Sequence, residues 1–209
     1  MLRSLRFPLF ATLFAFGALT SCKKDETNGL VVQAHDQNAF MTIMHDMSKQ
    51  MDAMKPTMDP DNDYAMMMVM HHTGAIKMAQ KEVSDGKDAT MQAIAQRVIT
   101  AQQAEITQFN AFLTSHPAHA PMTMAFMDRA MMVMETMDKN NDLRVLTGNA
   151  DQDFAQLMID HHTSAIEMSE DELSLGRENT PKTMAQKIID DQQMEIKELQ
   201  DWLLKNKKY

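Results

Sequence analysis

The stretch that decides the fold occurs twice: residues 64–78 read YAMMMVMHHTGAIKM, and residues 154–168 read FAQLMIDHHTSAIEM. The two copies lie 90 residues apart, and each is centred on two adjacent histidines. At the same offset, residues 41–113 align with residues 131–203 without a gap. Self-similarity at a fixed offset marks a duplicated structural unit. The sequence therefore predicts two tandem repeats of one fold.

The apolar residues of each repeat recur at helical spacing. Between residues 36 and 55, methionines follow one another at steps of three and four, which is the period of one helix face. Pro56 and Pro60 are expected to end this helix, because proline lacks a backbone donor and clashes with the preceding turn. A second helix is predicted over residues 63–85 and a third from Thr90 onward.

Glycine and proline mark the predicted ends of the later helices. Gly86 follows the second helix of the first repeat, and Gly176 follows its counterpart. A glycine in this place usually adopts a left-handed conformation that closes the helix. Thr180 and Pro181 are predicted to be the N-cap and the first residue of the last helix, because threonine can accept from exposed backbone donors and proline has none to expose.

These helices predict an all-α protein. The second and third helices of both repeats are expected to form a four-helix bundle with a pseudo-twofold axis, and the methionine-rich first helices are expected to pack alongside it. Residues 36–114 form repeat 1 in this prediction, residues 126–204 form repeat 2, and residues 115–125 are the linker.

The N-terminal residues are typical of an export signal. Two arginines precede an uncharged, mostly apolar run over residues 7–21, which is shorter than a typical membrane-spanning helix. The run ends in the lipobox-like sequence LTSC. We interpret residues 1–22 as a lipoprotein signal peptide with Cys22 as the lipidated residue, and residues 23–35 as a flexible tether; an uncleaved anchor helix is the alternative. The protein is then expected to be lipid-anchored in the outer membrane, on the periplasmic side or at the cell surface.

The charge and the cysteine content exclude several kinds of partner and site. Loss of Arg3 and Arg6 with the signal would leave 18 of the 20 basic residues against 29 acidic ones, a net charge of −11. This balance argues against nucleic acid as a partner, because phosphate binding needs a basic face. The only cysteine would carry the lipid, so the mature protein would have neither a disulfide nor a thiolate ligand.

Methionine is the unusual component: the chain contains 24 methionines, while aromatic residues make up only 6% of it. Neutral thioether sulfur is a good ligand for Cu(I) or Ag(I) and a poor one for zinc or magnesium, and neutral imidazole also suits copper. On the second helix, Met67, His71 and Met78 fall within about 40° of one another. The sequence thus predicts soft-metal sites. The candidate ligands are Met67, Met68, His71, His72, Met78, Met158, His161, His162 and Met168, with Met44, His45 and Met47 on the first helix.

The alternative is that these methionines only fill the core, because the flexible thioether packs irregular gaps well. Two features favour metal binding. Four methionines within residues 66–70 span about 200° of their helix, more than one core face would hold. Methionines also accompany the paired histidines twice. In this prediction His72 and His162 point toward the edge of the buried stripe.

Other polar groups extend the candidate sites. Glu105 and Glu195, on the inner side of the third helices, are predicted to accept the second ring N–H of a metal-bound histidine. A partly exposed carboxylate on the helix face is the alternative. The linker contains His116 and His119 close to further methionines, and this group either adds capture ligands or belongs to a polar loop.

The pattern Met-x-x-His-His-x-x-Ala-x-x-Met, followed by a helix with Gln-Gln-x-Glu-Ile, resembles the family of domain of unknown function 305 over about residues 36–114 and 126–204. The resemblance implies a ferritin-like helical bundle. It also implies a relation to periplasmic Met/His-rich proteins that are implicated in binding Cu(I) and silver and in copper tolerance. The positions that carry over are Met68, His71, His72 and Met78, and Met158, His161, His162 and Met168.

Three functions follow as hypotheses. The first is a secreted lipoprotein that binds Cu(I) or silver without catalysis and sequesters, buffers or transfers copper, with a copper donor or acceptor protein as partner. The second is a structural or signalling lipoprotein whose methionines are only core. The third, a ferritin-like di-metal oxidoreductase, ranks low because no glutamate stands three residues before either histidine of a pair.

The two repeats differ in their candidate donors. Met67 and Met70 of repeat 1 become Leu157 and Asp160 in repeat 2. Thioethers suit Cu(I), whereas a carboxylate suits harder ions. The sequence therefore predicts that repeat 1 holds the better Cu(I) site, and that repeat 2 is weaker or tolerates Cu(II).

Overall fold

The structure, a computed structural model, describes residues 32–206. No described residue belongs to a strand, which confirms the predicted all-α class, and no helix among them has the length and apolarity needed to cross a membrane. The predicted signal peptide with Cys22 and most of the predicted tether lie outside the described residues. The helices are η1 His35–Gln37, α1 Ala39–Asp52, α2 Pro60–Asp85, α3 Ala89–Ser115, α4 Ala125–Leu143, α5 Ala150–Leu175 and α6 Asn179–Asn206.

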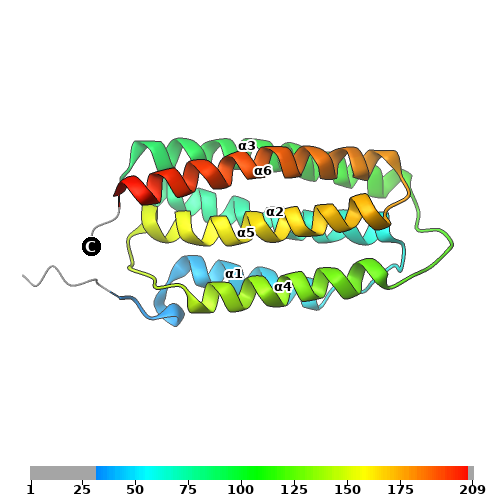
Figure 1. Ribbon diagram of the computed structural model, residues 1–209, viewed down its shortest axis with the longest axis horizontal. Coiled ribbons are helices and arrows are strands. Elements are labelled where there is room, and N and C mark those ends of the chain that lie inside the picture. The colour runs from blue at the N-terminus through cyan, green and yellow to red at the C-terminus, as the bar shows by residue number, and fades with distance from the viewer. Residues whose placement is uncertain (1–31, 207–209) are drawn as a thin grey trace, which may run out of the picture.

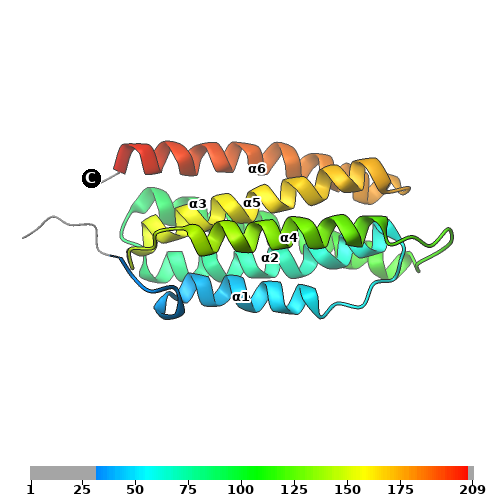
Figure 2. The same ribbon diagram turned by 60° about the horizontal axis from the view of Figure 1, so that its bottom comes forward.

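The helices stack in three layers. α2 and α5 form the middle layer, α3 and α6 cover one side of it, and α1 and α4 cover the other (Figure 1). Seen from a direction turned by 60°, α6 and α1 again lie on opposite sides of α2 and α5 (Figure 2). The predicted bundle of α2, α3, α5 and α6 is thus confirmed, with the methionine-rich α1 and α4 packed alongside. Each middle helix is consequently buried on two sides.

The repeat is visible in the middle helices, since α5 begins and ends 90 residues after α2. The two helices run antiparallel. Tyr64 Oη lies 2.9 Å from Ser169 Oγ, and His71 Nε2 lies 2.8 Å from Ser164 Oγ, so residue numbers rise along α2 as they fall along α5. The two histidine pairs therefore meet where the helices pass each other, on the pseudo-twofold axis.

Capping side chains set the helix starts and correct two predictions. Pro60 does not end the first helix but is the first residue of α2, where a missing N–H leaves no hydrogen bond unmade. Asp59 caps this helix by accepting from Asp61 N at 3.2 Å. The predicted cap at Thr180 was wrong, because α6 already begins at Asn179.

Gly86 and Gly176 follow α2 and α5 as predicted, but neither is left-handed: their φ angles are −60° and −67°. A Cβ at either position would overlap a buried glutamate carboxyl, that of Glu82 or Glu172. Glycine is needed here because the glutamate side chain folds back over the helix end, which is a requirement of space and not of backbone angle.

These two glutamates tie the ends of the middle helices together. Burial raises the pKa of Glu82 and of Glu172 to about 9, and the nearby carboxylates of Asp151 and Asp61 respectively add to the shift. Each glutamate therefore carries a proton at neutral pH and can donate it to its aspartate. Asp151 in turn accepts from Lys87 N at 2.9 Å, so the pair joins the end of α2 to the start of α5.

Candidate metal centre

Four histidines lie at the centre of the molecule, between the layers. All four side chains are fully buried, at 0% exposure. His71 from α2 and His161 from α5 place their ring centroids 3.7 Å apart. His72 and His162 contact glutamates of α3 and α6. The prediction that these two lie at the edge of the buried stripe was wrong, because the outer helices cover the middle ones on both sides.

The hydrogen bond of His161 defines which of its nitrogens is free. Its Nε2 lies 3.0 Å from the carbonyl oxygen of His71, and a carbonyl can only accept, so Nε2 carries the proton. Burial, followed by the nearby histidines, holds the pKa of His161 well below its ordinary value, so the ring is neutral. Its Nδ1 therefore presents a buried lone pair, and no described residue donates a hydrogen bond to it.

The same reasoning applies to His71. Its Nε2 lies 2.8 Å from Ser164 Oγ, and this hydroxyl lies 2.8 Å from the carbonyl oxygen of His161. We assign the one hydroxyl proton to that carbonyl, the stronger of its acceptors next to Met137 Sδ, so that the hydroxyl accepts from His71 Nε2. Burial likewise holds the pKa of His71 well below its ordinary value. Its Nδ1 also lacks a hydrogen-bond partner among the described residues.

The outer histidines of each pair contact carboxylates. His72 Nε2 lies 2.9 Å from Glu105 Oε2, and His162 Nε2 lies 2.8 Å from Glu195 Oε2. The oxygens lie off the N–H axis, so these are close polar contacts and not linear hydrogen bonds. Burial alone would raise the pKa of Glu105, but His72 and Lys187 outweigh it, and the pKa lies below its ordinary value. Each glutamate thus lies beside a histidine, while its predicted role as acceptor for a metal-bound ring stays a prediction.

Two glutamines were not predicted as part of the site. Gln102 and Gln192 are buried at equivalent positions of α3 and α6, and neither amide group has a hydrogen-bond partner among the described residues. With Glu105 and Glu195 they line a cavity of about 200 Å³ between the two helices. Buried polar atoms without partners usually signal a bound water or ion. A glutamine in the middle of an apolar stripe, repeated at the 90-residue offset, was the available signal.

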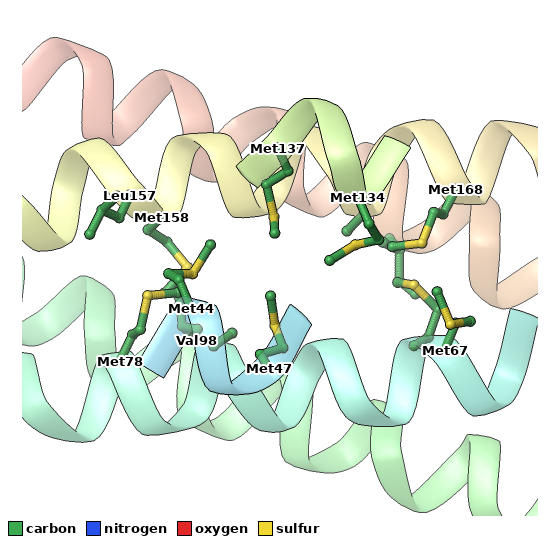
Figure 3. Packing of buried hydrophobic residues seen from close by; sticks show 14 of the residues in the cluster. Met44, Met47, Met67, Met78, Val98, Met134, Met137, Leu157, Met158 and Met168 are labelled. Carbon is green, nitrogen blue, oxygen red and sulfur yellow. The ribbon is translucent and has the colours of Figure 1, made fainter. Parts of the chain in front are cut away.

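The methionines gather differently from the prediction (Figure 3). Met67 and Met78 lie eleven residues apart on one helix, a rise of about 16 Å, so they cannot bind one ion. Because α2 and α5 are antiparallel, each group of thioethers draws on both repeats. The Met78 cluster contains Met44, Met78 and Met158, and the Met168 cluster contains Met67, Met134 and Met168.

Between these clusters, Met47 from α1 and Met137 from α4 point toward each other (Figure 3). Met137 Sδ lies 3.2 Å from Ser164 Oγ, the hydroxyl that also contacts His71. Met47 packs against Gly74, the residue equivalent to Ser164. The structure thus places two thioethers near the tilted ring pair of His71 and His161. Met137 was not among the predicted ligands, although it follows from Met47 by the repeat offset.

Two other predicted ligands differ in their exposure. His45 is half exposed and lies 3.4 Å from Asp142, apart from the buried Met44 and Met47. Met68 is fully buried in the core. The broad methionine coverage of residues 66–70 is explained by the burial of α2 on two sides, so it no longer argues for metal by itself.

Asp160 is not a free carboxylate beside the histidines of repeat 2. Arg144 donates to it with two nitrogens, Nε to Oδ2 at 2.7 Å and Nη2 to Oδ1 at 2.6 Å. Such a two-pronged ion pair occupies both carboxylate oxygens. The expectation that repeat 2 tolerates Cu(II) through this residue therefore loses its basis.

The sequence matches the family model described as domain of unknown function DUF305 twice, over residues 17–113 and 61–203. The two matches overlap and together span most of the chain. None of the curated proteins matches this sequence.

Solved structures share the fold. A DUF305 fragment from Deinococcus radiodurans aligns with a TM-score of 0.53 and 21% identity, covering 70% of this chain and 96% of the fragment. A DUF305 protein from Streptomyces coelicolor, described as a candidate secreted protein, aligns with a TM-score of 0.57 and 19% identity over 72% of this chain and 95% of its own. CopM in its Cu(I)-bound form aligns with a TM-score of 0.53 and 22% identity, over 69% of this chain and 96% of CopM.

Proposed function

This chain is a member of the DUF305 family, and we propose that it binds Cu(I) or Ag(I) through the histidines and methionines of its buried centre. The proposal includes the role predicted from the sequence: a protein without catalysis that sequesters, buffers or transfers copper and is lipid-anchored through Cys22. Support comes from the fold shared with CopM, which has been solved in Cu(I)-bound and silver-bound forms.

The observation that carries the proposal is the pair of free Nδ1 atoms on His71 and His161. A buried polar atom without a partner costs about 1–3 kcal/mol, and coordination of a metal ion by either Nδ1 would remove this cost for that ring. Since burial keeps both rings neutral, no proton must leave before an ion binds. Neutral nitrogen and thioether sulfur together favour a soft monovalent ion over zinc or magnesium.

The thioether clusters would supply further capacity. The Met78 cluster and the Met168 cluster each bring three thioethers together from three helices (Figure 3). One thioether binds weakly, so convergence of several is what a Cu(I) site requires. Core packing alone would also explain each cluster. A structural or signalling protein would therefore have the same arrangement of side chains but would bind no metal.

Anaerobic titration with Cu(I) against a chromophoric Cu(I) chelator separates these hypotheses. We expect the purified protein to compete with the chelator, and the variant His71→Ala/His161→Ala to bind at least about tenfold more weakly. The control His45→Ala removes an exposed histidine and should bind like the parent. Far-UV circular dichroism checks the fold, and His71→Gln/His161→Gln serves if the alanine variant unfolds. No competition by the parent would refute copper binding, and equal competition by parent and variant would refute this site.

One observation keeps a di-metal oxidoreductase as the second candidate. Glu105 and Glu195 reach the histidines from neighbouring helices, an arrangement that a search for Glu-x-x-His within one helix misses. Against it, Lys187 Nζ lies 3.0 Å from Glu105 Oε1 and already pairs with this carboxylate. Oxygen consumption after addition of Fe(II) under air would favour the oxidoreductase, and no consumption above the protein-free rate would exclude it.

A further inference from the structure

A second group of donors lies at the end of the molecule where the linker leaves α3. Asp59, the N-cap of α2, meets His116 and His119 of the linker, and one ligand atom from each lies within 4.8 Å of the other two. We call these three residues the linker cluster. Asp59 Oδ2 lies 2.9 Å from His119 Nδ1, and His116 Nε2 lies 3.2 Å from the same nitrogen.

These distances match the spacing between two ligand atoms that bind the same metal ion. A tetrahedral ion with ligand bonds of about 2.0–2.1 Å has ligand atoms about 3.3 Å apart. Two of the three atom pairs of the linker cluster already stand near that spacing, so small side-chain movements would admit an ion. Glu178 Oε1 lies 3.9 Å from His116 Nε2, close enough for a side-chain movement to bring it in as a fourth ligand.

The surroundings hold the carboxylate in place and leave the histidines open to solvent. Asp59 is fully buried, and its second oxygen, Oδ1, lies 2.8 Å from Arg177 Nη2. Partners of this kind orient a ligating side chain from behind. The side chains of His116 and His119 are 24% and 44% exposed, so an ion can reach them without opening the core.

The other end of the molecule shows that the fold does not need these residue types. The 90-residue offset relates Asp59 to Asn149 and His116 to Asn206. Asn149 caps α5 by accepting from Gln152 N at 3.0 Å, much as Asp59 caps α2. A neutral amide therefore suffices for the cap, so capping alone does not explain why position 59 carries a carboxylate.

We propose that the linker cluster binds one borderline divalent cation, Cu(II) or Zn(II), at a surface site separate from the buried centre. Imidazole nitrogen with one carboxylate suits these two ions, and the cluster has no thioether among its donors to favour Cu(I). The site does not depend on the proposed function, because none of its residues contacts the four central histidines.

Isothermal titration of the full-length, tag-free protein with Zn(II) and, separately, with Cu(II) under air tests this site. We expect one equivalent of binding that the variant His116→Ala/His119→Ala weakens at least tenfold for both ions or for one. Asp59→Asn should also weaken it while keeping the helix cap, because asparagine fills the equivalent position of α5. Anaerobic Cu(I) binding should be unchanged in all of these variants.

A matched control removes two other surface histidines. His35 and His45 lie 4.0 Å and 3.4 Å from the exposed Asp142, a wider and more open group than the linker cluster. His35→Ala/His45→Ala should leave the divalent equivalent intact. Absence of binding by the parent, or equal binding by the parent and His116→Ala/His119→Ala, would overturn the proposal. Binding lost equally in both double variants would also overturn it, since it would show only nonspecific surface capture.

Discussion

The two repeats place paired histidines at equivalent positions of α2 and α5, yet they supply different neighbours. Met67 of repeat 1 corresponds to Leu157 of repeat 2. Because the helices are antiparallel, Met67 lies in the Met168 cluster, while Leu157 lies beside Met158 in the region of the Met78 cluster (Figure 3). The difference is thus not between a soft repeat and a hard repeat. It distinguishes two ends of the middle layer: at one end position 67 provides a thioether, and at the other end the equivalent position 157 provides a leucine.

The largest change in Cu(I) binding should come from removing thioethers at one end of the middle layer. Met134→Leu/Met168→Leu disrupts the Met168 cluster, and Met44→Leu/Met158→Leu disrupts the Met78 cluster. Leucine has a similar volume, so each substitution should cost less than about 1.5 kcal/mol of stability. We expect each pair to abolish the Cu(I) binding of its own end, measured as stoichiometry in the anaerobic chelator titration. Unchanged stoichiometry in both variants would show that the clusters only fill the core.

A smaller effect is expected from the carboxylates behind the outer histidines. Glu105→Gln and Glu195→Gln remove the partner of His72 and of His162, and loss of such a partner typically lowers metal affinity about 10–100-fold. The effect should be larger for Glu105, whose side chain is 6% exposed, than for Glu195 at 17%. Cu(I) affinities of the two variants measure this difference. If the affinity stays at the parental value in both, neither glutamate supports the centre.

The buried glutamates at the ends of α2 and α5 should make the stability of the fold depend on pH in the same way. The ordinary pKa of a glutamate is 4.5, and Glu82 and Glu172 are raised to about 9 in the folded chain. The folded state therefore keeps two protons that the unfolded state releases. Their contribution to stability is full below pH 4.5 and is lost progressively as the pH rises to about 9.

The variants Glu82→Gln and Glu172→Gln test this contribution, because glutamine can donate without a proton that titrates. In each variant the melting temperature should fall less between pH 5 and pH 8 than it does in the parent, by about 2–4 °C for each kcal/mol of stability that is kept at pH 8. Melting curves at the two pH values measure the change. A parent whose melting temperature rises steadily from pH 5 to pH 9, with no effect of either substitution, would contradict the assignment.

The smallest effect should come from exchanging the single thioether that distinguishes the ends. Met67→Leu places leucine at both equivalent positions, and Leu157→Met places methionine at both. We expect a change of less than about tenfold in Cu(I) affinity, or 1.4 kcal/mol, downward for the first variant and upward for the second. Competition titrations of the two variants beside the parent provide the test. A change in the same direction for both would show that position 67 and position 157 act through packing.

The sequence predicted the features that depend on local pattern and on the repeat. Methionines at steps of three and four predicted α1, and the 90-residue offset predicted α5 once α2 was recognised as a helix. The pairing of Glu105 with a histidine also followed from its place on the inner side of α3. These predictions succeed because helical period and duplication are properties of the chain itself.

What the sequence could not provide depends on how distant elements meet. Nothing local to α2 shows that it runs antiparallel to α5, so the sequence did not show that Met67 lies near Met168 and that Met78 lies near Met158. The partner of Asp160 is an arginine sixteen residues away on the other side of a loop. The linker cluster likewise needed a contact between residues sixty positions apart, Asp59 and His119.

A crystal structure with Ag(I) bound, phased on the anomalous signal of silver, tests the central claim most directly. The account predicts silver at Nδ1 of His71 or of His161, with further silver at the Met78 and Met168 clusters. Silver found only at exposed side chains, with the four central histidines and both clusters empty, would contradict it and leave the methionines as core packing.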